Sequence, residues 1–252
     1  MSSQSITVGV VPVGGKGTRL SKHNPSHTPK VLYKLEGVEI LCYSLLSLKY
    51  AGCKQVICLT SDATHHDVEK FLITSALGID LRAVNAQAEG TAGALAFLGT
   101  VSDDFYYTNG DIIFHPAILL ELLNRHQSGD HIATVSASPS NVAPTHPHFT
   151  CDDHSGLKQV QLWPNTSPNS LCSLETAVFR PDIFDYLQQL SGGALTMEAL
   201  ALARKDGAEV SVLRTNRPWY HLAEPSDLEK FIEFKKALVV IEQLLGIKKA
   251  AS

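Results

Sequence analysis

The chain has 252 residues, of which 44% are hydrophobic and 18% are charged, and this composition is typical of a globular protein rather than a disordered one. Its formal net charge of -4 provides no overall positive field, so we expect neither a nucleic-acid partner nor an anionic membrane partner. No apolar run approaches the ~20 residues of a membrane span. The polar N-terminus does not resemble a signal peptide, and the five cysteines are irregularly spaced, so we expect a cytoplasmic protein with reduced thiols.

Apolar runs alternate with helical periodicity through the first half of the chain. Residues 6–13 form an apolar run that ends at glycines, which is typical of a buried parallel strand, and a polar loop follows over 14–29. We expect further strands at 54–60, 79–85 and 104–109, and helices at 38–50, 64–76, 91–99 and 116–127. This alternation predicts an α/β protein with a mixed, mostly parallel central sheet of Rossmann-like type, flanked by helices on both faces.

The second half of the chain is less regular. We expect strands at 131–137, 157–162, 171–179 and 208–213, and helices at 181–190, 196–205 and 225–245. The final helix carries more apolar surface than one stripe requires, so we expect it to pack on the sheet and to offer a homodimer contact. The segment 138–155 is rich in Pro, His, Ser and Asp and is interpreted as a surface excursion. We expect one domain over 1–252, with about 1–130 binding nucleotide, about 131–252 binding the acceptor, and no further β-helix domain.

Four potential metal ligands lie close together within that polar segment. They are His146, His148, Cys151 and His154, and they fit either a transition-metal site or a histidine-rich hairpin loop. We favour the loop, because Pro147 disturbs any helical spacing of the ligands.

The polar loop near the N-terminus has the composition of a phosphate-binding site. Residues 14–20 read Gly-Gly-Lys-Gly-Thr-Arg-Leu, and glycines let backbone N–H groups approach an anion closely. Lys16, Arg19 and Lys30 add positive charge, so the loop suits a triphosphate. It is not a Walker A loop, which needs Ser or Thr after Gly-Lys, nor a dinucleotide loop, which needs glycine in place of Leu20. The alternative is a tight turn with incidental surface charge.

Together with Lys30, this loop resembles the signature of sugar-phosphate nucleotidyltransferases, Gly-x-Gly-Thr-Arg-Leu followed by Pro-Lys. Residues 87–94 resemble the family's Gln-x-x-Gly-Thr-Ala segment, and residues 109–111 resemble its Asn-Gly-Asp metal segment. Residues 219–228 resemble Trp-x-Asp-Ile-Gly-Thr-Pro-Glu-Asp-Leu. The family includes the enzymes that make GDP-mannose, dTDP-glucose, UDP-glucose and GDP-heptose, and the resemblance implies a GT-A-type fold.

The resemblance implies attack of a sugar 1-phosphate oxygen on the α-phosphorus of a nucleoside triphosphate, giving an NDP-sugar and pyrophosphate. By similarity, Arg19 and Lys30 are catalytic, and Mg²⁺, or Mn²⁺ in its place, binds Asp111 with His221. Acceptor binding falls to Glu175 and Thr176. Nucleotide binding falls to Gly14, Gly15, Lys16, Gly17, Thr18, Gln87, Gly90, Thr91, Asn109 and Gly110.

The sequence departs from the family pattern at three positions. Two of them affect residues that would take part in the reaction, and the third precedes the glycine loop. His221 replaces the second metal carboxylate, and imidazole suits softer metals than Mg²⁺. Trp163 stands in the segment where the family places the lysine that meets the sugar phosphate, and Pro12 precedes the glycine loop. Two hypotheses follow: an active nucleotidyltransferase, or a catalytically degenerate regulatory subunit that binds nucleotide or NDP-sugar and needs a catalytic partner subunit.

Overall fold

A computed structural model describes residues 5–15, 17, 28–139, 146–162, 167, 169–222 and 227–247. Four residues that the sequence singles out lie outside these described residues, namely Lys16, Thr18, Arg19 and Trp163.

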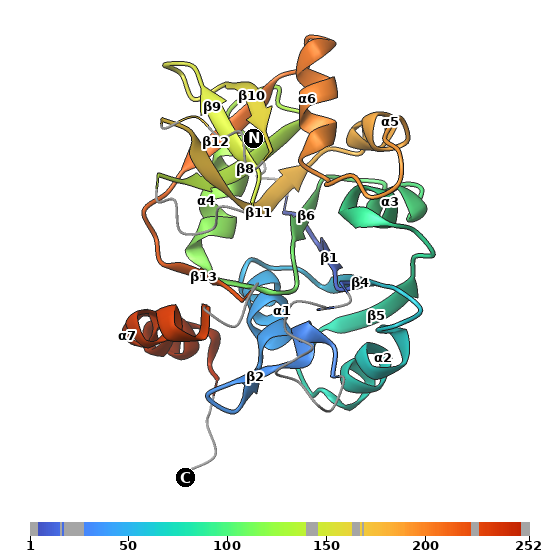
Figure 1. The fold of residues 1–252 in the computed structure, drawn as a ribbon, viewed down its shortest axis with the longest axis vertical. Helices are drawn as coiled ribbons and strands as arrows, with labels where there is room; N and C mark the ends of the chain where they lie inside the picture. Colours follow the sequence, from blue (N-terminus) through green and yellow to red (C-terminus); the bar gives the residue numbers. More distant parts are fainter. Residues whose placement is uncertain are drawn as a thin grey trace.

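The described chain folds around a nine-stranded mixed sheet with the order β10-β9-β11-β6-β1-β4-β5, to which β8 and β12 attach through β11 (Figure 1). The strands β5, β4, β1 and β6 are parallel, as expected for the first half. β11 runs antiparallel to β6, β8 and β9. The strand bounds are β1 Val8–Pro12, β4 Gln55–Thr60, β5 Asp80–Asn85, β6 Phe105–Thr108, β8 Ala133–Ser138, β9 His148–Cys151, β10 Leu157–Gln161, β11 Leu171–Phe179 and β12 Val210–Arg214.

Helices cover both faces of this sheet, which confirms the expected α/β architecture. One face packs against α1 (Ile40–Tyr50), α2 (His65–Thr74) and α4 (Ala117–His126). The other face packs against α3 (Gly90–Phe97), α5 (Ile183–Leu187) and α6 (Glu198–Lys205). Side chains alternate between the faces, as strand geometry requires.

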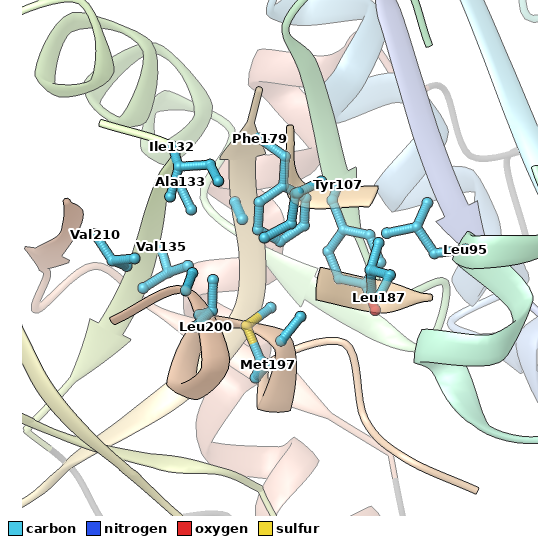
Figure 2. Packing of buried hydrophobic residues seen from close by; sticks show 14 of the residues in the cluster. Leu95, Tyr107, Ile132, Ala133, Val135, Phe179, Leu187, Met197, Leu200 and Val210 are labelled. Carbon is cyan, nitrogen blue, oxygen red and sulfur yellow. The ribbon is translucent and has the colours of Figure 1, made fainter. Parts of the chain in front are cut away.

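The face toward α3, α5 and α6 carries the larger aromatic core. Figure 2 shows Tyr107 and Phe179 from neighbouring strands facing Leu187, Met197 and Leu200 from the helical side. All five side chains are almost completely buried. This packing fixes β6 and β11 side by side, and Asn109 directly after β6 and Glu175 within β11 form part of the site described below.

The final helix packs differently from expectation. α7 (Asp227–Leu245) lies beside α1, away from the central sheet (Figure 1). Its apolar residues Phe234, Leu238 and Ile241 pack in one cluster with Ile40 of α1. The expected packing on the sheet is therefore wrong, because α1 already covers the sheet there and presents a second apolar stripe outward.

The interpretation of 138–155 as a surface excursion is wrong for residues 146–151, whereas residues 152–155 do form a surface turn between β9 and β10. Residues 148–151 form β9, which is paired on one side with β10 and on the other with β11. His146, His148 and Phe149 are all buried. Polar composition misled the prediction, because these polar side chains find hydrogen-bond partners inside the sheet.

Short elements that the sequence analysis did not identify complete the fold. β7 (Ile112–Phe114) pairs antiparallel with β13 (Trp219–His221). The 3-10 helix η2 (Lys30–Leu32) precedes a small pair of strands, β2 (Lys34–Leu35) and β3 (Val38–Glu39). Within the described residues, no helix has the length and apolar character needed to cross a membrane.

Candidate functional site

A pocket of about 230 Å³ opens at the carboxyl ends of the parallel strands β1, β4 and β6. Ligands of open α/β sheets bind at this edge. The lining residues are mostly small, with one lysine and one aspartate among them. They are Pro12, Val13, Gly14, Gly15, Lys30, Val31, Thr60, Ser61, Ala86, Ala88, Gly90, Thr91, Ala94, Asn109, Asp111 and Leu195.

One side of the pocket, here called the glycine side, consists of Gly14, Gly15, Gly90 and Thr91. The Gly14 carbonyl accepts a hydrogen bond from the Ser61 hydroxyl at 2.8 Å, which ties the loop after β1 to the end of β4. A Cβ on Gly15 would meet no atom within 4 Å, so the backbone there is open. An open backbone in a pocket permits close approach of an anion.

The first turn of α3 completes the glycine side. Gly90 has φ of +75°, and a Cβ there would lie 2.4 Å from the Ala194 carbonyl oxygen, so the turn requires glycine. The Thr196 N–H donates to the Thr91 hydroxyl at 2.9 Å, which holds the following loop against the helix. A helix N-terminus favours negative charge, and here it lines the pocket.

A second group of residues, here called the charged side, consists of Lys30 and Asp111, which line the pocket, and His221, which contacts Asp111 but does not line the pocket. The Lys30 ammonium forms an ion pair with Asp111 Oδ2. His221 Nε2 lies 3.3 Å from the same oxygen. Strand pairing explains this proximity, because His221 of β13 is opposite Ile112 of β7, the residue after Asp111.

Asp111 is held as a carboxylate. Burial alone would raise the pKa of Asp111, but the Lys30 ammonium beside it holds that pKa well below its usual value. The other carboxylate oxygen, Oδ1, is buried and has no hydrogen-bond partner among the described residues. An orphaned, buried carboxylate oxygen is costly unless a ligand satisfies it.

The donor set of the charged side fits a divalent cation that completes its shell from phosphate. Asp111 offers one oxygen without a partner, and His221 offers an imidazole nitrogen. No group of three or more His, Cys, Asp or Glu side chains within the described ranges is arranged to hold a metal ion. Any cation here would therefore take its remaining ligands from substrate oxygens and water.

His146 adjoins the charged side, and the sequence analysis missed its position. Its Nε2 lies 2.6 Å from His221 Nδ1, and its Nδ1–H donates to the Ser173 carbonyl at 2.9 Å. Burial lowers the pKa of His146 to about 3, so the ring is neutral. The neighbouring His148 contacts the Ser170 hydroxyl instead, at 3.0 Å. His146, His148, Cys151 and His154 thus form no common metal site. The histidine-rich composition of the segment did not indicate that His146 contacts His221.

Glu175 lies in a distorted part of β11. The pairing of β11 with β8 shifts register between Ser173 and Ala177, and Glu175 has φ of +47°. Its Oε2 accepts a hydrogen bond from the Asn109 amide at 2.7 Å. Burial, reinforced by the charge of Asp111, raises the pKa of Glu175 to about 8. Non-glycine residues with positive φ are uncommon and concentrate at functional sites.

Known proteins share the sequence and fold features described above. A family model described as the MobA-like NTP transferase domain matches residues 9–206. The chain belongs to this family. This match, together with the relatives and solved structures described next, confirms the expected resemblance to sugar-phosphate nucleotidyltransferases.

Two relatives of this chain are named as nucleotide-transferring proteins. A low-salt glycan biosynthesis nucleotidyltransferase of Haloferax volcanii is 25% identical over 87% of this chain and 63% of its own length. The catalytic subunit beta of mannose-1-phosphate guanylyltransferase of Drosophila melanogaster is 29% identical over 72% of this chain and 50% of its own length. The chain therefore spans half to about two thirds of the length of these relatives.

Solved structures share the fold of this chain. An inositol-1-phosphate CTP transferase from T. maritima superposes with a TM-score of 0.81, at 19% identity, over 99% of this chain and 100% of its own. A UDP-glucose pyrophosphorylase complexed with UDP-glucose gives a TM-score of 0.79, at 17% identity, over 93% of this chain and 98% of its own.

The nucleotidyltransferase fold brings most of the sequence-predicted residues to one place. Those that line the pocket are Gly14, Gly15, Lys30, Gly90, Thr91, Asn109 and Asp111. Gln87 is exposed and does not line it. Thr176 is completely buried, and its hydroxyl lies 3.0 Å from that of Thr108, inside the sheet. Gly17 lies beside Lys30 and Gly110 lies against Val13, and neither glycine lines the pocket.

Proposed function

We propose that this chain transfers a nucleoside monophosphate from a nucleoside triphosphate to a sugar 1-phosphate or a related phosphate acceptor. An acceptor phosphate oxygen forms a bond to the α-phosphorus, the bond from the α-phosphorus to the bridging oxygen breaks, and pyrophosphate leaves. The observation that carries the proposal is a single pocket whose lining contains both the Lys30–Asp111 ion pair and an open glycine backbone. The backbone N–H groups can bind an anion, and the lysine can neutralise charge.

The residues of the pocket divide the work of such a transfer. Gly14, Gly15 and the first turn of α3 would bind phosphate oxygens through N–H groups. Lys30 would neutralise charge that develops near the α-phosphate, which is an electrostatic form of catalysis. Glu175, with Asn109 beside it, would contact acceptor hydroxyls.

A divalent cation would bind between Asp111, His221 and substrate oxygens. When bound, Mg²⁺ or Mn²⁺ supplies Lewis-acid neutralisation of phosphate charge. The part of this chain is to hold Asp111 ionised, through Lys30, and to present a carboxylate oxygen that has no other partner within the described residues.

A regulatory protein that binds nucleotide without turnover is the second candidate. The observation that favours it is the replacement of a family carboxylate by His221, together with the direct pairing of Lys30 with Asp111. Lys30 cannot bind a phosphate group until its ion pair with Asp111 is broken.

Pyrophosphate release separates the two candidates. GTP, CTP, UTP, dTTP and ATP would be tested with sugar 1-phosphates and inositol 1-phosphate, first with Mg²⁺ and then with Mn²⁺. We expect turnover with at least one pair, and loss of that turnover in Asp111→Ala. The exposed Asp103→Ala is the matched control and should leave the rate unchanged. Binding of a nucleotide, seen as a rise in Tm, without turnover in the whole panel would refute the enzyme and favour the regulator.

A further inference from the structure

We propose that a groove between β10 and α6 is a second binding site, which takes a small anion that carries two or more phosphate groups. The groove has a volume of about 450 Å³, and it shares no lining residue with the pocket described above. Figure 1 shows α6 beside β10, and contacts between the two elements confirm that they are neighbours. The inference therefore goes beyond the proposed transfer reaction and does not depend on it.

Three cationic side chains line the groove, namely Lys158 of β10 and Arg204 and Lys205 of α6. No aspartate or glutamate is among the described residues of its lining. The whole chain has a formal net charge of -4, so this concentration of positive charge is local. Neighbouring cations repel one another, and an anion with several charges between them relieves that repulsion.

The three cations differ in how firmly they are held. Arg204 donates a hydrogen bond to the Ala208 carbonyl at 2.8 Å and pairs with the exposed Glu209 at 3.2 Å, so its guanidinium is fixed at the end of the helix. Lys158 and Lys205 are exposed, and neither forms an ion pair within the described ranges. A fixed guanidinium loses little freedom when a ligand binds, whereas two free ammonium groups can adjust to the oxygens of that ligand.

The rest of the lining is mostly apolar. Leu157 is buried, and Val160 packs against the same core cluster. Ala201 of α6 has a short side chain, and Gln159 adds an amide that can donate or accept. Small-molecule sites commonly combine apolar walls with a few polar or charged groups, and the volume of this groove is in their range. Free pyrophosphate and a nucleoside diphosphate share the phosphate chemistry that the cations require, and only the second would use the apolar part.

The same cations also have a purely structural interpretation. β10 is the outer strand of the sheet, where a lysine discourages pairing with another chain. Arg204 and Lys205 are in the last turn of α6, where positive charge complements the helix dipole. This interpretation explains each residue separately, and it predicts no saturable binding of phosphate groups. The proposed site requires such binding, so a titration separates the two.

The test locates binding on the full chain without turnover. The chain would be labelled with ¹⁵N, and its amide chemical shifts followed while inorganic pyrophosphate, ADP and glucose 1-phosphate are added separately at constant ionic strength. We expect saturable shifts in residues 157–160 and 201–205 with pyrophosphate and ADP, and weaker binding of glucose 1-phosphate, which has one phosphate group. Tighter binding of ADP than of pyrophosphate would identify a nucleotide as the ligand class, and the reverse order would identify free pyrophosphate.

A groove variant removes the two cations that have no partner. Lys158→Gln combined with Lys205→Gln keeps polar side chains of similar length, and Arg204 is left in place because its hydrogen bond supports the end of the helix. We expect this variant to bind pyrophosphate in the groove about tenfold more weakly than the wild type. Shifts at Gly15 and Gly90, which line the other pocket, should not change between the two proteins.

A matched control removes the same charge elsewhere. Lys54→Gln combined with Lys70→Gln replaces two exposed lysines outside the groove. This control should bind pyrophosphate in the groove as the wild type does, because only nearby charges act strongly at the ionic strength of the titration. Measurement of Tm for both double variants checks that they fold.

Several outcomes would overturn the inference. These are an absence of saturable shifts in 157–160 and 201–205 across the millimolar range, glucose 1-phosphate binding as tightly as pyrophosphate, or equal affinity of the groove variant and the control. Shifts in 201–205 that persist in the groove variant would also refute it, because they would arise at the other pocket, whose Thr91 contacts Thr196 just before α6. Binding in the groove without turnover on the substrate panel would refute only the proposed activity, whereas turnover without binding in the groove would refute only this inference.

Discussion

The two sides of the pocket are built in different ways. The glycine side comes from two short segments, one directly after β1 and one at the start of α3, and it presents backbone atoms to the pocket. The charged side is assembled from three single side chains in separate parts of the sequence, and these side chains contact one another. Substitutions on the glycine side should therefore act through steric overlap with the backbone or with a ligand. Substitutions on the charged side should act by leaving a charged side chain without its partner.

The largest effect is expected on the charged side, at Lys30. Lys30→Met removes the cation that pairs with Asp111, so a buried carboxylate loses its main partner. We expect kcat/KM for pyrophosphate release to fall by about 10²–10³-fold. We also expect the free energy of unfolding to fall by about 3 kcal/mol in urea titrations, because half of a buried ion pair remains.

A double variant sharpens this prediction. Lys30→Met combined with Asp111→Asn removes both charges, so we expect stability to return while activity stays lost. Lys34→Met is the matched control: this lysine is 62% exposed and pairs with Glu39 at the surface, so its loss should change stability by less than about 0.5 kcal/mol. A double variant as unstable as Lys30→Met alone would contradict the uncompensated-charge explanation.

The next effect concerns Glu175 and appears as a dependence of stability on pH. Its pKa is raised from 4.5 in the unfolded chain to about 8 in the fold, so the native state retains a proton that the unfolded state has lost. The contribution is fully present at low pH and is lost as pH rises through this window. Between about pH 5 and pH 8 we expect a loss of roughly 3 kcal/mol in the free energy of unfolding.

Glu175→Gln should flatten that dependence while keeping the contact with Asn109. Urea titrations of both proteins across the pH range would show the difference, with the largest gain for the variant at the alkaline end. Glu69→Gln, at a side chain that is 50% exposed, is the control and should follow the wild-type curve. Parallel curves for the wild type and Glu175→Gln would show that Glu175 is ionised in the fold.

The third prediction concerns the backbone conformation of Gly90 on the glycine side. At Gly90 an added Cβ would lie 2.4 Å from the Ala194 carbonyl oxygen, in a conformation with φ of +75°. We expect Gly90→Ala to lower the free energy of unfolding by about 2 kcal/mol, because strain and overlap add. Gly93→Ala, three residues along the same helix, lacks the positive φ and should change stability by less than about 1 kcal/mol. Equal Tm values for the two variants would contradict the strain argument.

The contrast between the two sides also explains what the sequence could and could not predict. The alternation of apolar runs predicted the parallel strands and most helices, because each signal lies within one element. The glycine loop and Asp111 were recognisable for the same reason. The contact of His221 with Asp111 depends on the register of β13 against β7, and that of His146 on the end of β11, neither of which leaves a local pattern. Polar residues in 146–151 indicated a surface loop because composition does not reveal a partner across the sheet.

The smallest effect should separate binding from stability at Gly15. A Cβ there meets no atom within 4 Å, so Gly15→Ala should leave Tm unchanged. The new methyl group would project from the open backbone of the pocket and obstruct close approach of a phosphate. We expect affinity for inorganic pyrophosphate, measured by calorimetry, to fall about tenfold, which corresponds to about 1.4 kcal/mol. Gly192→Ala is the control, because its Cβ would lie 3.7 Å from Glu89 in ordinary contact and outside the pocket lining, so neither property should change. Unchanged pyrophosphate affinity in Gly15→Ala would mean that the phosphate contacts lie elsewhere, and the charged side would then have to bind the anion without help from the backbone.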